Sequence, residues 1–223
     1  MISLIVPVLN EEEVLRENFR HLEALKKDSE IIFVDGGSSD GTMEIAGKLG
    51  RVLKGSRGRA LQMNCGAREA KGDMLLFLHA DSYIEGKSLL TAYERIKDGA
   101  IGGCFTQRLN NDKPIYRIIE TIGNRRARAR KIFYGDQGIF VRKDIFFNLG
   151  GFPHVSVMED VIFSQKLNRL GRVEVLDELI YVSTRRWERG GFFNTNLAYM
   201  VMALLFYLRV PLSIIKKLYR DVR

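Results

Sequence analysis

The stretch Met74-Leu75-Leu76-Phe77-Leu78-His79-Ala80-Asp81 runs from five consecutive apolar residues into a histidine and a carboxylate. An apolar run of this length predicts a strand in the interior of a parallel sheet that helices cover. A carboxylate at the mouth of such a strand is costly to place there unless it is paired or bound to a metal. The stretch therefore predicts an α/β fold with a ligand site where this strand ends.

The segments before this strand alternate between strand and helix patterns. We expect strands at 2–7, 30–35 and 52–54, and helices at 10–25, 42–49 and 58–70. Asn10 has the features of a helix N-cap with Glu13 as its capping-box partner, and Asp40 is placed to cap the second helix. The alternation predicts a mostly parallel central sheet flanked by helices.

The segments after this strand follow a less regular pattern. We expect helices at 87–97, 113–131 and 161–170, strands at 101–106, 138–142 and 173–176, and then C-terminal helices. With 223 residues and neither a linker nor an internal repeat, the chain is expected to form a single domain.

Composition narrows the class of protein. Hydrophobic residues make up 46% and charged residues 28%, which argues against a disordered chain. The net charge of +8 suits phosphate-rich ligands, nucleic acid or anionic lipid. Cys65 and Cys104 form no disulfide or metal-binding motif and are expected to be buried, in a reducing, cytosolic setting. The N-terminus has no basic segment and is not expected to be a signal peptide.

Two segments leave several interpretations open. The apolar run 197–208 is shorter than the roughly 20 residues that span a bilayer, so we expect a core helix, with an interfacial membrane helix as the alternative. A basic tail follows it, formed by Lys216, Lys217, Arg220 and Arg223. The basic stretch 125–131 is a solvated helix face, a phosphate-bearing acceptor site or a membrane-surface patch, and its sparse aromatic residues argue against single-stranded nucleic acid.

Three polar loops follow predicted parallel strands and should converge on one edge of the sheet. They carry Pro7 with Asn10-Glu11, Asp35-Gly36-Gly37, and His79-Ala80-Asp81. Asp81 is well placed to hold a hard divalent cation that bridges two phosphates. Asp35 fits a plain turn equally well, because Asp-Gly is common turn chemistry.

Two helix starts carry further charged residues. Glycine-rich nucleotide motifs of the P-loop and dinucleotide types are absent, but Arg57 and Arg59 open a helix and suit a diphosphate or a base. A surface loop is the alternative there. Glu159 and Asp160 open the helix at 161–170, where the positive end of the helix dipole favours ionised carboxylates. Ordinary first-turn capping is the alternative for them.

An ordered set of motifs extends over nearly the whole chain. It consists of Val6-Pro7-x-x-Asn10-Glu11, Val34-Asp35-Gly36-Gly37-Ser38-x-Asp40-Gly41-Thr42, Gly58-Arg59-Ala60-x-x-x-Asn64-x-Gly66-Ala67, Phe77-Leu78-His79-Ala80-Asp81, Gly150-Gly151-Phe152, Met158-Glu159-Asp160 and Arg185-Arg186-Trp187. In this order the motifs resemble the family-two glycosyltransferases. Gly135-Asp136-Gln137-Gly138 and the compact length resemble a small stand-alone subgroup associated with radical-SAM gene neighbourhoods and proposed arsenosugar biosynthesis.

The resemblance implies a GT-A-type nucleotide-diphospho-sugar transferase fold and an activity. The activity would be that of an inverting, hexosyltransferase-like enzyme that uses Mn²⁺ or Mg²⁺ and a nucleotide sugar, with a UDP-sugar favoured. The acceptor would be the hydroxyl of a small or lipid-linked molecule. The chain would divide into a nucleotide-binding half (1–108), an acceptor-side half (109–190) and C-terminal helices (191–223).

The resemblance also implies residue roles. The donor would bind Pro7, Asn10, Glu11, Asp35, Gly37, Arg57, Arg59, Asn64, His79, Ala80 and Asp81, with Asp35 on the nucleobase and Asp81 on the metal. Asp160 would be the general base, beside Glu159, and the acceptor would contact Gly135, Asp136, Gln137, Arg186 and Trp187. His79 stands where many members have Asp, and Ser183 stands where processive members have the Gln of Gln-x-x-Arg-Trp. The second departure argues against processive polymer synthesis.

Three other functions compete with this one. A sugar-phosphate nucleotidyltransferase is disfavoured because the acidic residues at 11–13 would repel a triphosphate. A polyprenyl-phosphate glycosyltransferase at the membrane and a non-catalytic nucleotide-sugar-binding scaffold both stay open. We expect a cytoplasmic protein that binds no nucleic acid, with peripheral contact at the inner membrane surface as the alternative location. The sequence does not indicate an oligomeric state.

Overall fold

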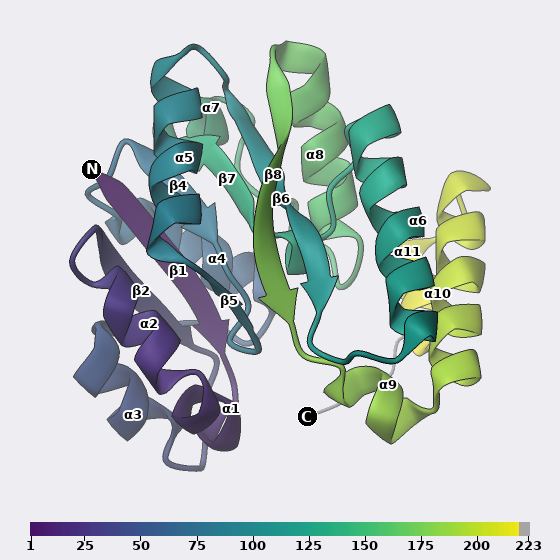
Figure 1. Cartoon of the computed structure of the whole chain (residues 1–223), viewed down its shortest axis with the longest axis horizontal. Helices are drawn as coiled ribbons and strands as arrows, with labels where there is room; N and C mark the ends of the chain where they lie inside the picture. The colour runs from purple at the N-terminus through teal and green to yellow at the C-terminus, as the bar shows by residue number, and fades with distance from the viewer. Residues whose placement is uncertain (219–223) are drawn as a thin grey trace.

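The computed structural model of the chain describes residues 1–218 and places eight strands in one sheet (Figure 1). The strands are β1 (Ile2–Val8), β2 (Ser29–Asp35), β3 (Arg51–Lys54), β4 (Met74–Phe77), β5 (Ser82–Ile84), β6 (Gly102–Leu109), β7 (Ile139–Arg142) and β8 (Val173–Val182). Their order across the sheet is β3-β2-β1-β4-β7-β6-β8-β5.

Most of these strands run in the same direction. β1 pairs in parallel with both β2 and β4, and β2 pairs in parallel with β3. β7 is antiparallel to its neighbours β4 and β6, and β5 is antiparallel to β8. The predicted mostly parallel sheet is therefore confirmed, and the carboxyl ends of β1, β2 and β4 meet at one edge.

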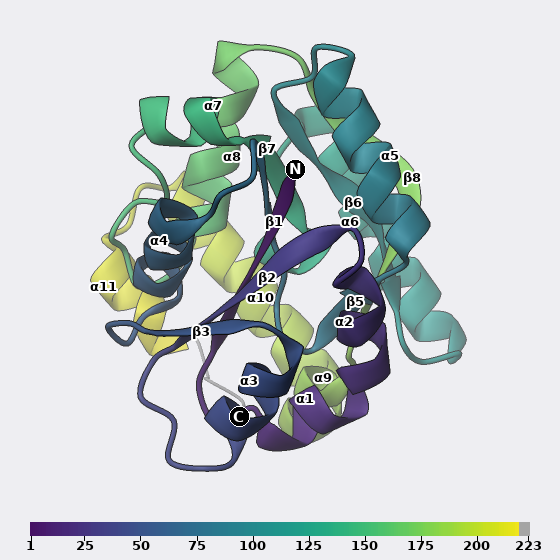
Figure 2. The ribbon, with the colours of Figure 1, turned by 90° about the vertical axis from the view of Figure 1, so that its left-hand side faces the viewer.

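Helices cover both faces of the sheet (Figure 2). One face carries α1 (Glu12–Glu17), α2 (Phe19–Leu25), α3 (Thr42–Leu49) and α5 (Gly86–Lys97), and the other carries α4 (Arg59–Glu69), α7 (Lys143–Asn148) and α8 (Glu159–Leu170). β1 contributes to both cores, because Leu4 and Val6 pack into the first and Ile5 into the second. Burial on both faces explains the continuous apolar character of β1 and β4.

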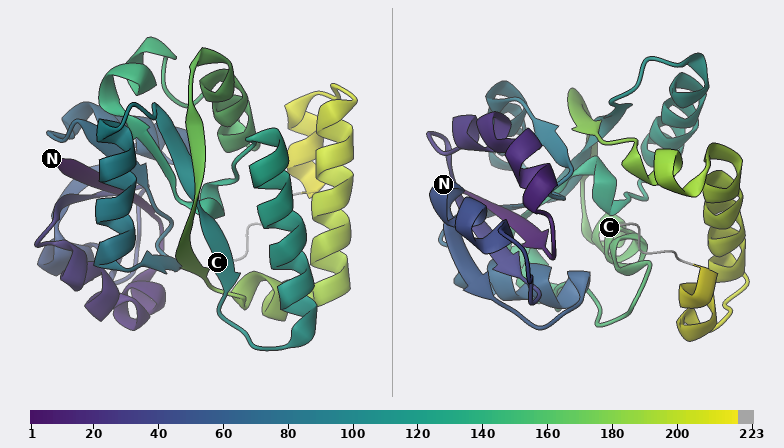
Figure 3. Two further views of the ribbon diagram at one scale, coloured as in Figure 1. Left: turned by 45° about the horizontal axis from the view of Figure 1, so that its top comes forward. Right: turned by 90° about the horizontal axis from the view of Figure 1, so that it is seen from below.

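The C-terminal part forms a further layer at one edge of the sheet (Figure 3). It comprises α6 (Pro114–Arg130), a 3-10 turn η1 (Gly135–Gln137), α9 (Arg185–Gly190), α10 (Phe192–Tyr207), α11 (Leu212–Ile215) and a second 3-10 turn η2 (Lys216–Leu218). α6 and α10 meet through the edge-to-face contact of Tyr116 with Phe192, whose ring centroids lie 5.5 Å apart. Arg220 and Arg223 of the predicted basic tail lie outside the described residues.

The first predicted helix differs from the structure at its start and in its middle. Asn10 is not an N-cap: it has a φ of 52°, and its side-chain oxygen accepts from the amide of Ser39, 2.9 Å away. The capping box with Glu13 is absent, since no side-chain cap precedes α1. The helix is also divided at Asn18, whose amide group reaches Ala80 O at 2.8 Å and so connects this helix pair to the loop after β4.

Four other elements differ from the prediction in their length, their presence or their burial. β8 extends six residues beyond the predicted end at 176, and neither β5 nor α7 was predicted. The prediction that the apolar run 197–208 forms a core helix is wrong, because Met202 alone is buried in α10. The alternation of strands and helices, by contrast, was sufficient to predict the architecture.

Candidate functional site

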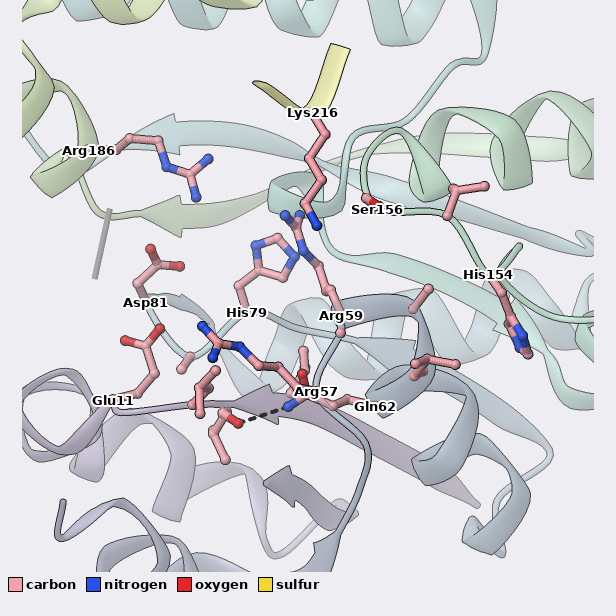
Figure 4. A pocket seen from close by; sticks show the side chains of 18 of the residues that line it. Glu11, Arg57, Arg59, Gln62, His79, Asp81, His154, Ser156, Arg186 and Lys216 are labelled. Carbon is pink, nitrogen blue, oxygen red and sulfur yellow. Dashed lines mark hydrogen bonds between the residues drawn. The ribbon is translucent and has the colours of Figure 1, made fainter. Parts of the chain in front are cut away.

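A cavity of about 600 Å³ lies where β1 and β4 end (Figure 4). Its walls come from the end of β1, the start of α4, the loop after β4, the loop before α8, the start of α9 and η2. The side chains and backbone that line it belong to Pro7, Val8, Leu9, Glu11, Arg57, Gly58, Arg59, Ala60, Leu61, Gln62, His79, Ala80, Asp81, His154, Val155, Ser156, Arg185, Arg186 and Lys216. Two of the three predicted loops thus meet in one cavity, as parallel strands require.

Two carboxylates in this cavity share one guanidinium group. Arg185 donates to both carboxylate oxygens of Glu11, at 3.1 and 2.8 Å, and its Nε lies 3.4 Å from Asp81 Oδ2. The three side chains are 15% to 19% exposed. Figure 4 shows the carboxylates of Glu11 and Asp81 next to each other at one side of the cavity. Arg185 offsets the repulsion between two acids that the strand ends bring together.

Positive charge dominates the rest of the lining. Arg57 and Arg59 lie on either side of Gly58, which has a φ of 138° that an L-residue rarely adopts, so the turn into α4 needs glycine. Arg186 and Lys216 approach from the opposite wall (Figure 4). Arginine forks and a helix start around one cavity suit phosphate oxygens. The predicted contact of Arg57 and Arg59 with the site is therefore consistent with their position.

Glu159 is buried behind this wall, with 2% of its surface exposed. Its carboxylate forms an ion pair with Arg59, whose Nε lies 3.3 Å from Oε1. Burial raises the pKa of Glu159, against the opposing effect of Arg59. The helix dipole was expected to favour the ionised carboxylate, and burial acts against it. Glu159 does not line the cavity, so its contact with Arg59 is the way it influences the site.

Asp160 and Gly135 lie next to His79, which lines the cavity. Asp160 Oδ2 accepts from the amide of Gly135 at 2.7 Å, and Oδ1 accepts from the amide of Val161 at 2.7 Å. A Cβ on Gly135 would stand 2.8 Å from His79 Nε2 and 3.3 Å from Asp160 Oδ2. Glycine at 135 therefore lets the imidazole and the carboxylate approach the same peptide.

His79 is neutral in this environment. Burial lowers its pKa to about 3, and the positive charge of Arg59 acts in the same direction. Within residues 1–218, its buried Nε2 has no hydrogen-bond partner. A neutral imidazole with a free ring nitrogen can donate to or accept from a ligand, but it does not add a charge to the site.

Two of the predicted acceptor residues, Asp136 and Gln137, belong to a polar cluster next to Asp160. Asp136 accepts from Gln107 Nε2 at 2.8 Å, and Arg126 donates to the Gln137 side chain at 3.1 Å while it stacks on Tyr134. Burial raises the pKa of Asp136, against the opposing charge of Arg126. In the described part of the chain, Asp136 Oδ1 and Gln137 Nε2 lack a hydrogen-bond partner. Arg126 is thus turned inward, whereas its neighbours Arg125 and Arg128 in the basic stretch are exposed.

Four predicted site residues have other contacts and do not line the cavity. Asp35 accepts from the amides of Gly37 and Ser38 at 3.0 and 3.1 Å, which forms the turn that the sequence left open. Asn64 donates to and accepts from the backbone of Phe152, at 2.8 and 2.9 Å. Trp187 is buried and packs edge to face on Tyr116 and Tyr199. Asn10 holds the Ser38–Ser39 loop.

Sequence reasoning missed several residues that line the cavity. Gln62 donates to Val8 O and Val34 O, both at 2.8 Å, and so ties α4 to the ends of β1 and β2. Arg185 belongs to the Arg185-Arg186-Trp187 motif and Lys216 to the basic tail, but neither was predicted to line the site. His154 and Ser156 precede the Glu159-Asp160 pair and had no pattern of their own. The sequence places them close to a recognised motif, but that position alone does not predict that they line a cavity.

A divalent cation fits the acidic side of the cavity only with help from a ligand. Among residues 1–218, no group of three or more His, Cys, Asp or Glu side chains is arranged to hold a metal ion. Glu11 and Asp81 nevertheless converge on a single cationic group, and Mg²⁺-type sites often use one or two carboxylates together with substrate phosphates. The donor set therefore fits a cation that is bound together with a diphosphate.

Comparison with known proteins identifies the family. A family model described as Glycosyl transferase family 2 matches residues 3–152. The chain belongs to glycosyl transferase family 2. The matched residues of this family-2 chain include β1, β2, β4 and the loops that carry Glu11, Asp35 and Asp81.

Curated relatives of this family-2 chain match part of its length. Poly-beta-1,6-N-acetyl-D-glucosamine synthase from Staphylococcus aureus (strain COL) is 29% identical over 133 residues, covering 54% of this chain and 32% of that protein. Undecaprenyl-phosphate 4-deoxy-4-formamido-L-arabinose transferase from Pseudomonas fluorescens (strain Pf0-1) is 32% identical over 93 residues, covering 36% of this chain and 27% of that protein. The chain thus spans about a third of the length of the first of these relatives.

Solved structures share the fold of this family-2 chain. The mannosyltransferase from Pyrobaculum calidifontis in complex with GDP-Man and Mn²⁺ has a TM-score of 0.72 at 19% identity, covering 94% of this chain and 64% of that one. TarS 1-349 from S. aureus in complex with UDP-GlcNAc has a TM-score of 0.67 at 21% identity, covering 82% of this chain and 58% of that one. The predicted GT-A fold is confirmed.

We expect Asp136→Asn to raise the free energy of unfolding at neutral pH. The folded-state pKa of Asp136 is raised, so the stabilising protonated form is fully present below the unfolded-state pKa and is lost as pH rises through the folded-state value. Asparagine stays neutral throughout, and the advantage of the variant should shrink as pH falls. Urea unfolding between pH 4 and 8 tests this, with the exposed Asp177→Asn as control. A variant that is less stable than the wild type at neutral pH would contradict it.

Proposed function

We propose that this chain is a glycosyltransferase that moves a sugar from a nucleotide-diphosphate sugar to an acceptor hydroxyl, with inversion at the anomeric carbon. The observation that carries the proposal is the cavity at the ends of β1 and β4, where a pair of acids faces a wall of cations. Acids and cations in one cavity suit a diphosphate that binds together with a divalent cation.

The donor would bind with its diphosphate against Arg57, Arg59 and Lys216. These cations approach from two walls and can neutralise the charge that develops on the leaving diphosphate. Glu159 would orient Arg59 through their ion pair. The nucleobase would lie near the turn that Asp35 forms, and a UDP-sugar is the favoured donor. The contact with the base stays a prediction, because Asp35 is held by its own loop.

Asp160 would act as the general base. An inverting displacement needs one carboxylate that removes the proton of the acceptor hydroxyl. The amide of Gly135 and the amide of Val161 fix the orientation of both Asp160 oxygens, which prepares the carboxylate without a further side chain. The His79 imidazole packs against Gly135, and its Nε2 would contact the donor.

A divalent cation, Mn²⁺ or Mg²⁺, would be held by Asp81 with Glu11, and it would supply charge neutralisation for the diphosphate. Arg185 now neutralises both carboxylates. We infer that this arginine and the cation compete for the two acids, and that the freed guanidinium group is then available to the donor phosphates. The solved mannosyltransferase contains GDP-Man and Mn²⁺, which supports a metal-assisted donor site.

The acceptor would approach from the side of Gly135, Asp136, Gln137, Arg186 and Trp187. Of these residues Arg186 lines the cavity, whereas the Gln137 side chain is fully buried and does not. The acceptor would be a small or lipid-linked molecule. The similarity to the undecaprenyl-phosphate transferase supports the lipid-linked class. Membership of the small stand-alone subgroup and a cytoplasmic location stay predictions.

Donor binding can be tested by thermal unfolding with UDP, GDP, CDP, dTDP and ADP, each with and without Mn²⁺. One nucleotide should stabilise the wild type in a metal-dependent way, and Asp81→Ala should remove the metal-dependent part. A ligand at a hundredfold excess over its Kd stabilises by about 2.7 kcal/mol, which is a shift of several degrees. If none of the five changes the unfolding temperature with Mn²⁺, the chain is a scaffold or uses another donor.

Arg185→Gln should raise the affinity for Mn²⁺ in the absence of nucleotide. The substitution removes the guanidinium group that pairs with Glu11 and Asp81, and about tenfold tighter binding corresponds to about 1.4 kcal/mol. Free Mn²⁺ is measured by electron paramagnetic resonance during titration. Arg189→Gln is the matched control, since Arg189 lies one turn later and pairs with the exposed Glu13 at 4.0 Å. Unchanged or weaker Mn²⁺ binding in Arg185→Gln would show that the two cations do not compete.

Asp160→Asn should reduce turnover by about 10²–10⁴-fold, because the amide cannot accept the acceptor proton. The slow hydrolysis of the identified nucleotide sugar serves as the assay when no acceptor is known. Nucleotide affinity should stay within about twofold of the wild type, since Asp160 does not line the donor cavity. A variant that keeps full turnover would remove Asp160 as the base and direct attention to Glu159.

A further inference from the structure

α10 presents an uncharged, apolar face away from the protein. Its sequence, FFNTNLAYMVMALLFY, has no charged residue. Large side chains at i, i+4, i+7 and i+11 point outward: Phe193 is 80% exposed, Leu197 61%, Met200 70% and Leu204 59%. Tyr207 and Leu208 continue this face and are also exposed. A large apolar helix face is normally covered, so this face is expected to be covered by something else.

α6 extends the same apolar surface. Ile115, Ile118 and Ile122 are exposed at a helical spacing of three and four residues, and Ile122 is 64% exposed. α6 and α10 both lie at the outer edge of the molecule in Figures 1 and 3, and Tyr116 and Phe192 join them near their first turns. We call the outward side chains of both helices the α6–α10 face.

Basic residues predominate on the two segments that carry the α6–α10 face, although the exposed Asp177 pairs with Arg128. Segment 191–218 contains three basic residues, Arg209, Lys216 and Lys217, and no acidic residue. Segment 113–134 contains seven basic residues and one acid, Glu120, which is buried and paired with Arg117. Arg125 follows Ile118 and Ile122 on the same exposed helix side. Apolar side chains surrounded by basic ones match an anionic lipid surface.

The length of α10 determines how it would meet a membrane. Its 16 residues extend about 24 Å at 1.5 Å per residue, which is short of the ~30 Å hydrocarbon core. No helix within residues 1–218 is both long and apolar enough to cross a bilayer. Contact would therefore be along the helix, with its outer side chains in the headgroup and upper acyl region.

We propose that the α6–α10 face binds the surface of an anionic membrane, with α10 parallel to the bilayer plane. A second copy of the chain is the less favourable occupant, because each copy carries a net charge of +8 and its basic residues flank the face that would be covered. The proposal names a binding surface and does not require the transferase activity.

The position of α10 connects this surface to the cavity. On its inner side, Tyr199 accepts a hydrogen bond from Arg186 Nη1 at 2.8 Å, and Arg186 lines the cavity. Ile215, fully buried with Met202 and Val157, fixes the segment that brings Lys216 to the opposite wall. If the proposed function also holds, an acceptor at the membrane surface would enter beside Arg186 and Lys216, and the lipid-linked class of acceptor follows.

The test is sedimentation with vesicles of phosphatidylcholine alone and of phosphatidylcholine mixed with phosphatidylglycerol. The wild type should bind the anionic vesicles and lose that binding in high salt. Met200→Glu/Leu204→Glu should weaken binding at least about tenfold, and Arg125→Glu should weaken it severalfold. Leu90→Glu/Leu170→Glu is the matched control, because those leucines are 44% and 46% exposed but lie on α5 and α8. The control pair should bind like the wild type.

Three outcomes overturn the proposal. The first is a folded wild type that binds neither kind of vesicle. The second is equal loss of binding in the control pair and the α10 pair, which would make the attraction non-specific. The third is a wild-type dimer in sedimentation velocity that Met200→Glu/Leu204→Glu converts to a monomer, which would assign the face to a second copy. Thermal unfolding of each variant, with and without nucleotide, distinguishes a lost surface from a lost fold and from failure of the proposed donor site.

Discussion

Glu11 and Asp81 meet the guanidinium group of Arg185 at the point where β1 and β4 end. Both strands are buried on two faces, and this brings the loops that carry the two acids to one place. The guanidinium group of Arg185 offsets the repulsion between the two carboxylates. Because Arg185 begins α9, this pairing links the loops after β1 and β4 to the segment that leads into α10.

The opposite side of the cavity uses the reverse arrangement, in which a buried acid orients a cation. Glu159 holds Arg59, whose guanidinium group then lies beside His79 and suppresses its protonation together with burial. The result is a site whose charge is concentrated in arginines and one lysine, with a neutral imidazole between them. Such a site attracts a polyanion, and His79 adds no charge to it.

Local sequence was sufficient to predict a strand or a site residue where the residue pattern is compatible with few other structures. The apolar run ending in Asp81 specified a buried strand and an acid at its mouth, and the structure places that acid in the cavity. The prediction of Asn10 as an N-cap is wrong because the contact with the Ser38–Ser39 loop sets its φ of 52°. A capping pattern in the sequence does not contain that contact. The sequence did not predict Arg185 and Lys216 as cavity residues for the same reason. They lie more than 100 residues beyond Asp81 and reach the cavity through tertiary packing.

The apolar run in α10 could not be assigned from composition, because a core helix and an interfacial helix have the same residues there. Tertiary structure decides between them through the few side chains that face inward. Met202 and Ile215 are buried against Val157, and Tyr199 binds Arg186. These contacts hold α10 in place while its outer side chains stay exposed, and they position Arg186 and Lys216, which line the cavity. A change that displaces α10 should therefore alter both the position of Lys216 and the accessibility of the cavity.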